Sequence, residues 1–271
     1  GDHRDLHSFP TRRSSDLGLI AALYLTQQAQ DALLLPAPDV SIHVDDEHVF
    51  ITESEVLELL RFEALIFEGQ RKEQLDAEAI EKYLTSISQV KDVKVYSMIG
   101  SQWKIDIDMR KPIARIYNKW GQTYYLDDAG NTMDISSQHV ARSLVVTGEI
   151  PDRFGQESVS EIINNDSLKS IRKLDDIYRI SDYVCNDPLF RSLIGQIHLK
   201  KNGDFVLIPL VGDQKIVFGS AYSETQVSKK FEKLNVFYKE GMPYEGWGTY
   251  SEISLKYEGQ IVCKRKNEIN G

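Results

Sequence analysis

The residue pair with the clearest potential for chemistry is Asp106 and Asp108, two carboxylates separated by one residue. Such a pair can bind a divalent cation or divide acid and base roles in catalysis. Residues 103–109 alternate between apolar and polar types without a fault. The apolar face carries Trp103, Ile105, Ile107 and Met109. This alternation predicts a half-buried strand, and we favour its solvated face over a metal or acid/base site as the role of the two aspartates.

Histidines and carboxylates also meet around residues 45–47, where His43 and His48 flank the acidic triplet Asp-Asp-Glu. These residue types can ligate a metal ion. The triplet is a polar stretch between two short apolar ones, so a solvated loop is favoured. His139 and His198 have no obvious partner in the sequence.

Two aromatic groups raise the question of ligand stacking. Tyr244, Trp247 and Tyr250 alternate with glycines and could contact a sugar, but a packed loop that caps a β-rich domain is favoured. Trp120 and the pair Tyr124-Tyr125 lack interleaved basic residues, so a base-stacking platform is not predicted.

The chain has two cysteines, Cys185 and Cys263, and no CxxC motif. This excludes a disulfide framework and a cysteine-type zinc site, while a single bridge between the two remains open. The sequence contains no Gly-rich phosphate loop, nucleophile elbow or HExxH motif. We therefore predict no catalytic, cofactor-binding or metal-binding residue, and no small-molecule substrate.

Composition narrows the class of partner. Hydrophobic residues make up 41% and charged residues 27%, and the formal net charge is −9. An acidic chain without a dense Lys/Arg run repels phosphate backbones, so nucleic-acid binding is not expected. A chain of this length is enough for two domains.

The secondary structure that positions the residues named above is predicted next. Residues 41–112 are predicted to form a strand, two helices and two strands, in that order. Thr52 and Glu55 form a capping box for the first helix, and Asp76 is the expected N-cap of the second. The second helix has an apolar face made of Ile80, Tyr83, Leu84 and Ile87. Pro112 ends the strand pattern, and a domain boundary is predicted there.

Residues 113–266 are predicted to form a mainly antiparallel β-domain with flanking helices, which makes the fold class α+β. Ser167 is the expected cap of one helix, and Ser223 with Gln226 forms a second capping box. Asn202-Gly203 predicts a tight type I′ hairpin. The last hairpin is expected at 251–257 and 260–265, and residues 267–271 form a C-terminal tail.

The N-terminal segment calls for a separate interpretation. His7 to Leu17 reads HSFPTRRSSDL, which matches the translation of a common sequencing-library adapter, so residues 1–17 are interpreted as an adapter artefact. The uncharged run 18–26 is too short to span a bilayer, which takes about 20 residues. Residues 18–30 are interpreted as the remnant of a transmembrane helix rather than a short amphipathic helix. Residues 31–40 are then a linker.

The order of motifs carries a family resemblance. The strand–helix–helix–hairpin of 41–112 resembles a POTRA domain. It is followed by RKPIAR at 110–115, YYLDDAG at 124–130 and LKYEGQIVCKR at 255–265. In this order the chain resembles the bacterial cell-division family FtsQ, called DivIB in some lineages. The resemblance spans Gly18 to Lys266, and no single motif is strong.

The resemblance implies a non-enzymatic divisome scaffold. Its members are single-pass inner-membrane proteins with most of the chain in the periplasm at the division septum. They bind FtsB and FtsL and help to control septal peptidoglycan synthesis, and their POTRA module is associated with septal recruitment. FtsB adds a strand to the last hairpin. Carried over by position, the partner-binding residues are Lys256, Tyr257, Gly259, Gln260, Ile261, Val262, Cys263 and Lys264. Lys264 stands where the family often has an aromatic residue, which puts side-chain selectivity in doubt.

Two other functions are weighed against the scaffold. A POTRA-containing protein of outer-membrane assembly or secretion is the alternative, and it would show tandem POTRA units or a C-terminal barrel pattern. An envelope hydrolase would need a convergent set of titratable groups. The sequence shows neither pattern.

Overall fold

The computed structural model describes residues 13–44, 50–98, 100–136 and 140–266, with side chains from residue 17 onward. The predictions for His48, His139, most of 1–17 and the tail 267–271 therefore lie outside the described residues. The chain divides into two compact units. The first comprises the residues before Val44 together with Ile51–Met109, and the second comprises Val44, Phe50 and the residues from Arg110 onward.

The first unit begins with helix α1, Arg13–Asp31. Its described apolar side chains are exposed, among them Leu19, Ile20 and Leu23. None of the described helices combines the length and the apolar character that a bilayer crossing requires.

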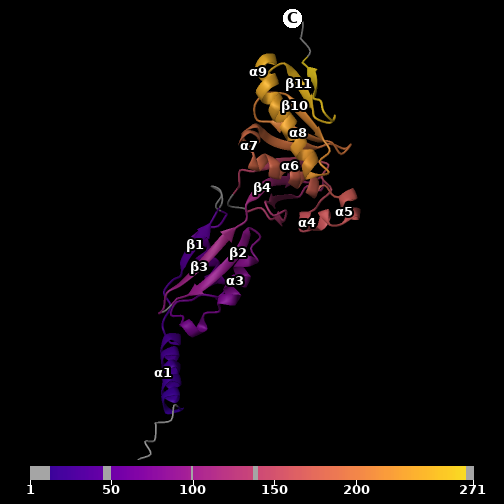
Figure 1. Cartoon of the computed structure of the whole chain (residues 1–271). Helices are drawn as coiled ribbons and strands as arrows, with labels where there is room; N and C mark the ends of the chain where they lie inside the picture. Colours follow the sequence, from indigo (N-terminus) through magenta and orange to yellow (C-terminus); the bar gives the residue numbers. More distant parts are fainter. Residues whose placement is uncertain (1–12, 45–49, 99, 137–139, 267–271) are drawn as a thin grey trace, which may run out of the picture. The chain divides into compact units, whose positions relative to one another are not determined.

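The rest of this unit is a three-stranded sheet with two helices. Its elements are β1 (Asp39–His43), α2 (Glu53–Phe62), η1 (Lys72–Gln74), α3 (Ala77–Thr85), β2 (Val90–Ser97) and β3 (Trp103–Met109). The strand order is β1-β3-β2, with β1 parallel and β2 antiparallel to β3. Figure 1 shows β3 between its two neighbours and α3 beside β2.

Local sequence signals in the first unit are confirmed. The Thr52 hydroxyl accepts from the amide of Glu55, whose carboxylate accepts from the amide of Thr52. Asp76 caps α3 by accepting from the amide of Ala79. In β3 the predicted apolar face is buried, from Trp103 to Met109. The α2 and α3 residues with no exposed surface are Val56, Leu60, Ile80 and Leu84.

Among its described residues, the second unit contains one sheet of nine strands in the order β12-β11-β10-β9-β8-β7-β4-β5-β6. The strands are β4 (Pro112–Tyr117), β5 (Thr123–Asp127), β6 (Thr132–Met133), β7 (Leu144–Gly148), β8 (Ile194–Leu199), β9 (Phe205–Pro209), β10 (Lys215–Gly219), β11 (Tyr250–Ser254) and β12 (Val262–Arg265). Five neighbouring pairs are antiparallel and three are parallel, so the sheet is mixed. The whole chain is thus α+β, with a large mixed sheet.

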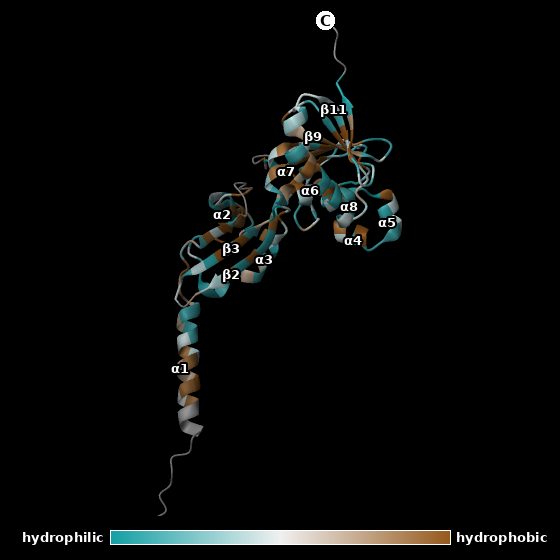
Figure 2. Cartoon of the chain, turned by 45° about the horizontal axis from the view of Figure 1, so that its top comes forward, coloured by the Kyte–Doolittle hydropathy of each residue, from teal (hydrophilic) through white to brown (hydrophobic). Residues whose placement is uncertain are grey.

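Helices of the second unit supply the other half of its core. They are α4 (Val159–Ile163), α5 (Asp166–Ile171), α6 (Leu174–Asn186), α7 (Pro188–Leu193), α8 (Glu224–Val236), the π-helical turn η2 (Phe237–Gly241) and α9 (Met242–Glu245). Phe231 of α8 packs on Phe190 of α7, Phe218 of β10 and Tyr183 of α6, with ring centroids 4.5 to 5.0 Å away. In Figure 2 the strands around β9 are largely brown, as expected for strands that face this core.

The RKPIAR sequence has a structural role at the start of β4. Arg110 Nη1 donates to Asp127 Oδ2 at 2.9 Å. The Asp127 carboxylate is buried and also accepts from the amides of Ala129 and Asn131. The basic motif and the Asp-Ala-Gly turn are therefore tied to each other by one buried carboxylate.

Three local predictions in this unit are wrong. The N-cap in the region of Ser167 is Asn165, which begins α5, and α6 begins separately at Leu174. Asn202 has no positive φ, although Gly203 has φ +83, so the turn before β9 is not type I′. Ser223 caps α8, but the Gln226 side chain accepts from the amide of Tyr222 and so forms no capping box. A glutamine can reach more than one amide near a helix start, which the sequence does not resolve.

Candidate partner-binding edge

The last hairpin forms one edge of the nine-stranded sheet. β11 pairs with β10 in parallel and with β12 in antiparallel orientation. Within the described part of the chain, β12 is the final strand in the order. An edge strand presents backbone N–H and C=O groups that can pair with an incoming strand. The hairpin residues carried over from the family therefore lie on and beside an open edge.

The direction of each backbone group follows from one hydrogen bond. The amide of Lys266 donates to the carbonyl of Thr249 at 3.0 Å, so the backbone groups of Lys266 face the β11 side. Backbone groups of successive strand residues point to opposite sides. The register shift between the two strands lies between Tyr250 and Glu252 of β11, so the alternation along β12 is uninterrupted. By that alternation, Val262 and Lys264 face β11, and Cys263 and Arg265 turn their N–H and C=O groups toward the open edge.

Side chains around the edge differ in exposure. Tyr257 and Val262 are 52% and 44% exposed, so their apolar surface faces solvent. Ile261 and Cys263 are half-buried and pack against the core. Burial raises the pKa of the Cys263 thiol, with the Glu245 carboxylate adding to the effect. No disulfide joins Cys185 and Cys263, so the bridge left open by the sequence is absent.

Lys256 pairs with the chain itself. Its Nζ lies 2.7 Å from Asp204 Oδ2, next to the turn that precedes β9. This hydrogen bond raises the pKa of Lys256. Partial burial alone would raise the pKa of Asp204, but the hydrogen bond from Lys256 lowers it below the usual value. The side chain that the family resemblance assigns to the partner is thus engaged in an internal ion pair.

A second lysine holds the loop between β11 and β12. Lys233 lies in the last turn of α8. Its Nζ donates to the carbonyls of Tyr257 at 2.7 Å, Gln260 at 3.0 Å and Leu255 at 3.5 Å. Desolvation lowers the pKa of Lys233, and the nearby Glu258 carboxylate opposes that shift. The ammonium group has three donors, and all three are directed at this loop.

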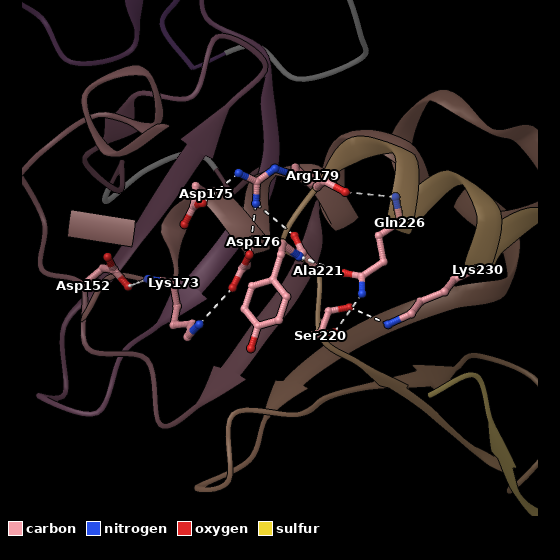
Figure 3. Close-up of polar contacts among 11 residues, drawn as sticks. Asp152, Lys173, Asp175, Asp176, Arg179, Ser220, Ala221, Gln226 and Lys230 are labelled. Carbon is pink, nitrogen blue, oxygen red and sulfur yellow. Dashed lines mark hydrogen bonds and ion pairs between the residues drawn. The ribbon is translucent and has the colours of Figure 1, made fainter. Parts of the chain in front are cut away.

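Helix α8 is in turn fixed by a network of buried charges, shown in Figure 3. Arg179 of α6 donates to Asp175 at 2.8 Å, to Asp176 at 3.0 Å and to the carbonyl of Ala221 at 2.9 Å. Lys173 Nζ donates to Asp176 at 3.0 Å. The residues between β10 and α8 are therefore bound to α6 through Arg179.

The start of α8 continues this network (Figure 3). Gln226 donates to the Ser220 hydroxyl, and Lys230 Nζ donates to the carbonyls of Phe218 and Ser220. Burial lowers the pKa of Lys230 to about 8, and Lys233 adds a smaller effect of the same sign. α8 thus joins the buried network at one end and the exposed hairpin at the other.

The structure shows where the candidate metal and acid/base residues of the sequence lie. No group of three or more histidine, cysteine or carboxylate side chains among them could hold a metal ion. Asp106 pairs with Lys104 at 2.7 Å, Asp108 is exposed, and exposed His43 lies 3.9 Å from Asp106. A cavity of about 660 Å³ is lined by Lys111, Arg142, Arg191 and Cys185 among others, with no carboxylate or imidazole among its described lining residues.

Aromatic residues behave partly as predicted. Trp247 stacks on Tyr238 and Tyr250 is buried, whereas Tyr244 is 90% exposed. Trp120 has Lys119 and Arg153 over its ring, at 4.8 and 4.5 Å from the centroid. Arg153 thus reaches the Trp120 ring from a distant part of the sequence, while the prediction that Trp120 forms no base-stacking platform stays a prediction.

Sequence reasoning missed Lys233 and Asp204 as determinants of the edge. Lys233 is one lysine in the run KKFEK, and its neighbours give no signal of a role. His198 also has a partner that the sequence did not indicate, the Thr147 hydroxyl at 3.0 Å. Each of these contacts joins elements that are distant in the chain.

The second unit is an α+β domain whose described mixed sheet ends with β12 on one side and β6 on the other. Residues 111–264 match the family model described as FtsQ/DivIB, C-terminal related, which covers more than half of the 271 residues. The chain belongs to this family, whose members are non-enzymatic scaffolds of cell division. No curated protein matches the chain.

Proposed function

We propose that this protein is a divisome scaffold that captures an FtsB-like partner, together with an FtsL-like one, by β-strand addition at β12. One observation carries the proposal: β12 is the last described strand of the sheet. By the alternation described above, Cys263 and Arg265 turn their backbone groups outward. Strand addition derives affinity from main-chain hydrogen bonds and selectivity from alternate side chains. The receiving segment is Gln260 to Lys264.

Side chains beside the edge would supply the selectivity. Val262 offers exposed apolar surface on the receiving strand, and Tyr257 offers it beside that strand. Gly259 has φ +70, a conformation that glycine adopts without strain, and it lets the chain turn into β12. Lys256 acts indirectly, because its ammonium group is bound to Asp204.

The remaining parts of the proposal concern place and regulation. The first unit has the strand–helix–helix–strand–strand order expected of a POTRA domain, and we assign it the role of septal recruitment. The protein is anchored in the inner membrane by a single N-terminal segment, with both units in the periplasm. Partner capture at β12 there helps to control septal peptidoglycan synthesis. Family membership supports the cell-division role.

The test replaces one outward N–H. Cys263→Pro removes a donor that faces the open edge, whereas Cys263→Ala keeps the donor and removes the thiol. The probe is a soluble fluorescent peptide that spans the extracytoplasmic part of an FtsB protein, and the full chain is titrated by anisotropy. We expect Cys263→Pro to weaken capture by about tenfold or more, the equivalent of at least one hydrogen bond, and Cys263→Ala to bind like wild type.

The structure also shows why this position is better than its neighbours. The amide of Val262 faces β11, so Val262→Pro would damage the hairpin itself. Ile261 packs against the core, so Ile261→Lys would disturb folding as well as binding. Equal capture by the Pro and Ala variants at position 263, with both folded by thermal unfolding, would rule out strand addition at β12.

A further inference from the structure

The loop between β11 and β12 depends on few hydrogen bonds. The described hydrogen bonds of residues 256–261 are those that Lys233 makes to the carbonyls of Tyr257 and Gln260, and the ion pair of Lys256 with Asp204. No backbone–backbone hydrogen bond is described for these six residues. One cation from α8 therefore carries most of the polar contact between this loop and the rest of the unit.

A groove in the protein surface runs between the loop and helix α8. This shallow groove of about 520 Å³, open to solvent, lies along the end of α8 with η2 and the loop, and its lining includes Lys233, Phe237, Gly259 and Ile261. A loop with few buried contacts opens locally at low cost in free energy. The hydrogen bonds of Lys233 to Tyr257 and Gln260 cross this groove and join helix α8 to the loop.

The hydrogen bonds of Lys233 lie next to the first residue of the edge strand β12. Gln260 precedes the first residue of β12 by two positions, and its carbonyl is one of the three that Lys233 binds. At the other end of β12, Lys266 donates to Thr249 and Arg265 pairs with Glu245 at 3.0 Å. The strand is thus held by the sheet and α9 at its end, and by Lys233 at its beginning.

We propose that Lys233 is a positioning residue that pre-organises β12 to receive a partner strand, by fixing the carbonyls of Leu255, Tyr257 and Gln260 from helix α8. The inference rests on the proposed function and deepens it. A strand that is already ordered loses less conformational entropy when it pairs, so its affinity is higher. Lys233 needs no contact with the partner to have this effect.

The experiment compares substitutions along one helix in the full chain. Lys233→Met removes all three donors and keeps an apolar stem, and Lys233→Gln is a second, polar variant. Lys233→Arg retains a cation with several donors. Lys229→Met is the matched control, because Lys229 is an exposed lysine on α8 and the substitution removes the same charge. Each variant is measured by amide hydrogen exchange of residues 255–265 and by capture of the FtsB peptide.

We expect Lys233→Met and Lys233→Gln to speed amide exchange at Val262 and Lys264, whose N–H groups face β11, by more than about tenfold, and to weaken peptide capture by about tenfold. Lys233→Arg should stay within about threefold of wild type in both measurements. Lys229→Met should match wild type. The thermal unfolding midpoint of the unit should change little, since the affected loop lies outside the core.

Two outcomes separate the inference from the function on which it rests. A wild-type chain that captures no peptide contradicts strand addition, and with it the role of Lys233 in binding. A wild-type chain that binds, with Lys233→Met and Lys233→Gln binding equally well, overturns the positioning role alone. The positioning role is also overturned if amide exchange accelerates in these two variants while their affinity for the peptide is unchanged.

Discussion

Two charged clusters in the second unit use the same kinds of bonds in different surroundings. The first joins Arg179 to Asp175, Asp176 and Ala221, and each of these side chains is less than one-tenth exposed. The second joins Lys256 to Asp204 and Lys233 to the last loop, where the side chains are partly exposed. One helix, α8, connects the two clusters.

The degree of burial determines how much each cluster contributes to the stability of the folded state. A buried charge that loses its partner keeps its desolvation penalty, so its removal disrupts the folded state. A surface charge that loses its partner is solvated by water, so the loss is small and local. We therefore expect the Arg179 cluster to determine the stability of the unit, and the two hairpin lysines to determine the geometry of its open edge.

The largest effect is expected from Arg179→Met. The substitution leaves the carboxylates of Asp175 and Asp176 buried and short of a cation, and it removes a donor from the carbonyl of Ala221. The free energy of unfolding should fall by about 3–5 kcal/mol, measured by chemical denaturation. Lys169→Met is the control, because Lys169 pairs with the fully exposed Asp166 and its loss should change stability little. Similar losses in both variants would contradict the contrast between the clusters.

A smaller effect should appear as a pH dependence at Asp152. Burial raises the pKa of this carboxyl to about 6, even though the amide of Lys173 donates to it and Arg172 lies nearby. The ionised form is thus disfavoured in the folded state, and its destabilisation is full above pH 6 and vanishes as the pH falls toward the unfolded pKa near 4. The ionised Asp152 carboxylate lowers the free energy of unfolding by at most about 3 kcal/mol at pH 7.

Asp152→Asn removes this titration while keeping an oxygen that can accept from Lys173. The difference in unfolding free energy between variant and wild type should shift in favour of the variant as the pH rises from 4 to 7. Urea titrations at several pH values measure that difference. A difference that does not change with pH would show that Asp152 titrates normally in the folded protein.

The comparison also shows what sequence can and cannot supply. Thr52 and Asp76 were identified as caps because their bonds reach residues three positions away. The alternation of residues 103–109 likewise identified the buried face of β3, because an alternating pattern involves only residues that are close in the sequence. These patterns depend only on neighbours in the chain.

The contacts of the two clusters could not be predicted in that way. Lys233 and Gln260 are 27 positions apart, and Lys256 and Asp204 are 52 apart. The packing of α8 against the strands determines which groups these lysines contact. A lysine in a polar run of the sequence does not indicate such a contact. The family resemblance located the hairpin but assigned Lys256 to the partner, whereas its ammonium group binds Asp204.

The smallest effect is expected from Lys256→Met, and it tests that assignment. Both Lys256 and Asp204 are partly exposed, so the unfolding midpoint should move by no more than about 3 °C. If the lysine acts through Asp204, then Asp204→Asn should weaken peptide capture as much as Lys256→Met does, by less than about threefold, and the double variant should be no worse than either single one. Anisotropy titrations of the three variants measure this. A loss of tenfold or more in Lys256→Met alone would instead show that the lysine leaves Asp204 and contacts the partner, because only a direct contact makes the two substitutions unequal.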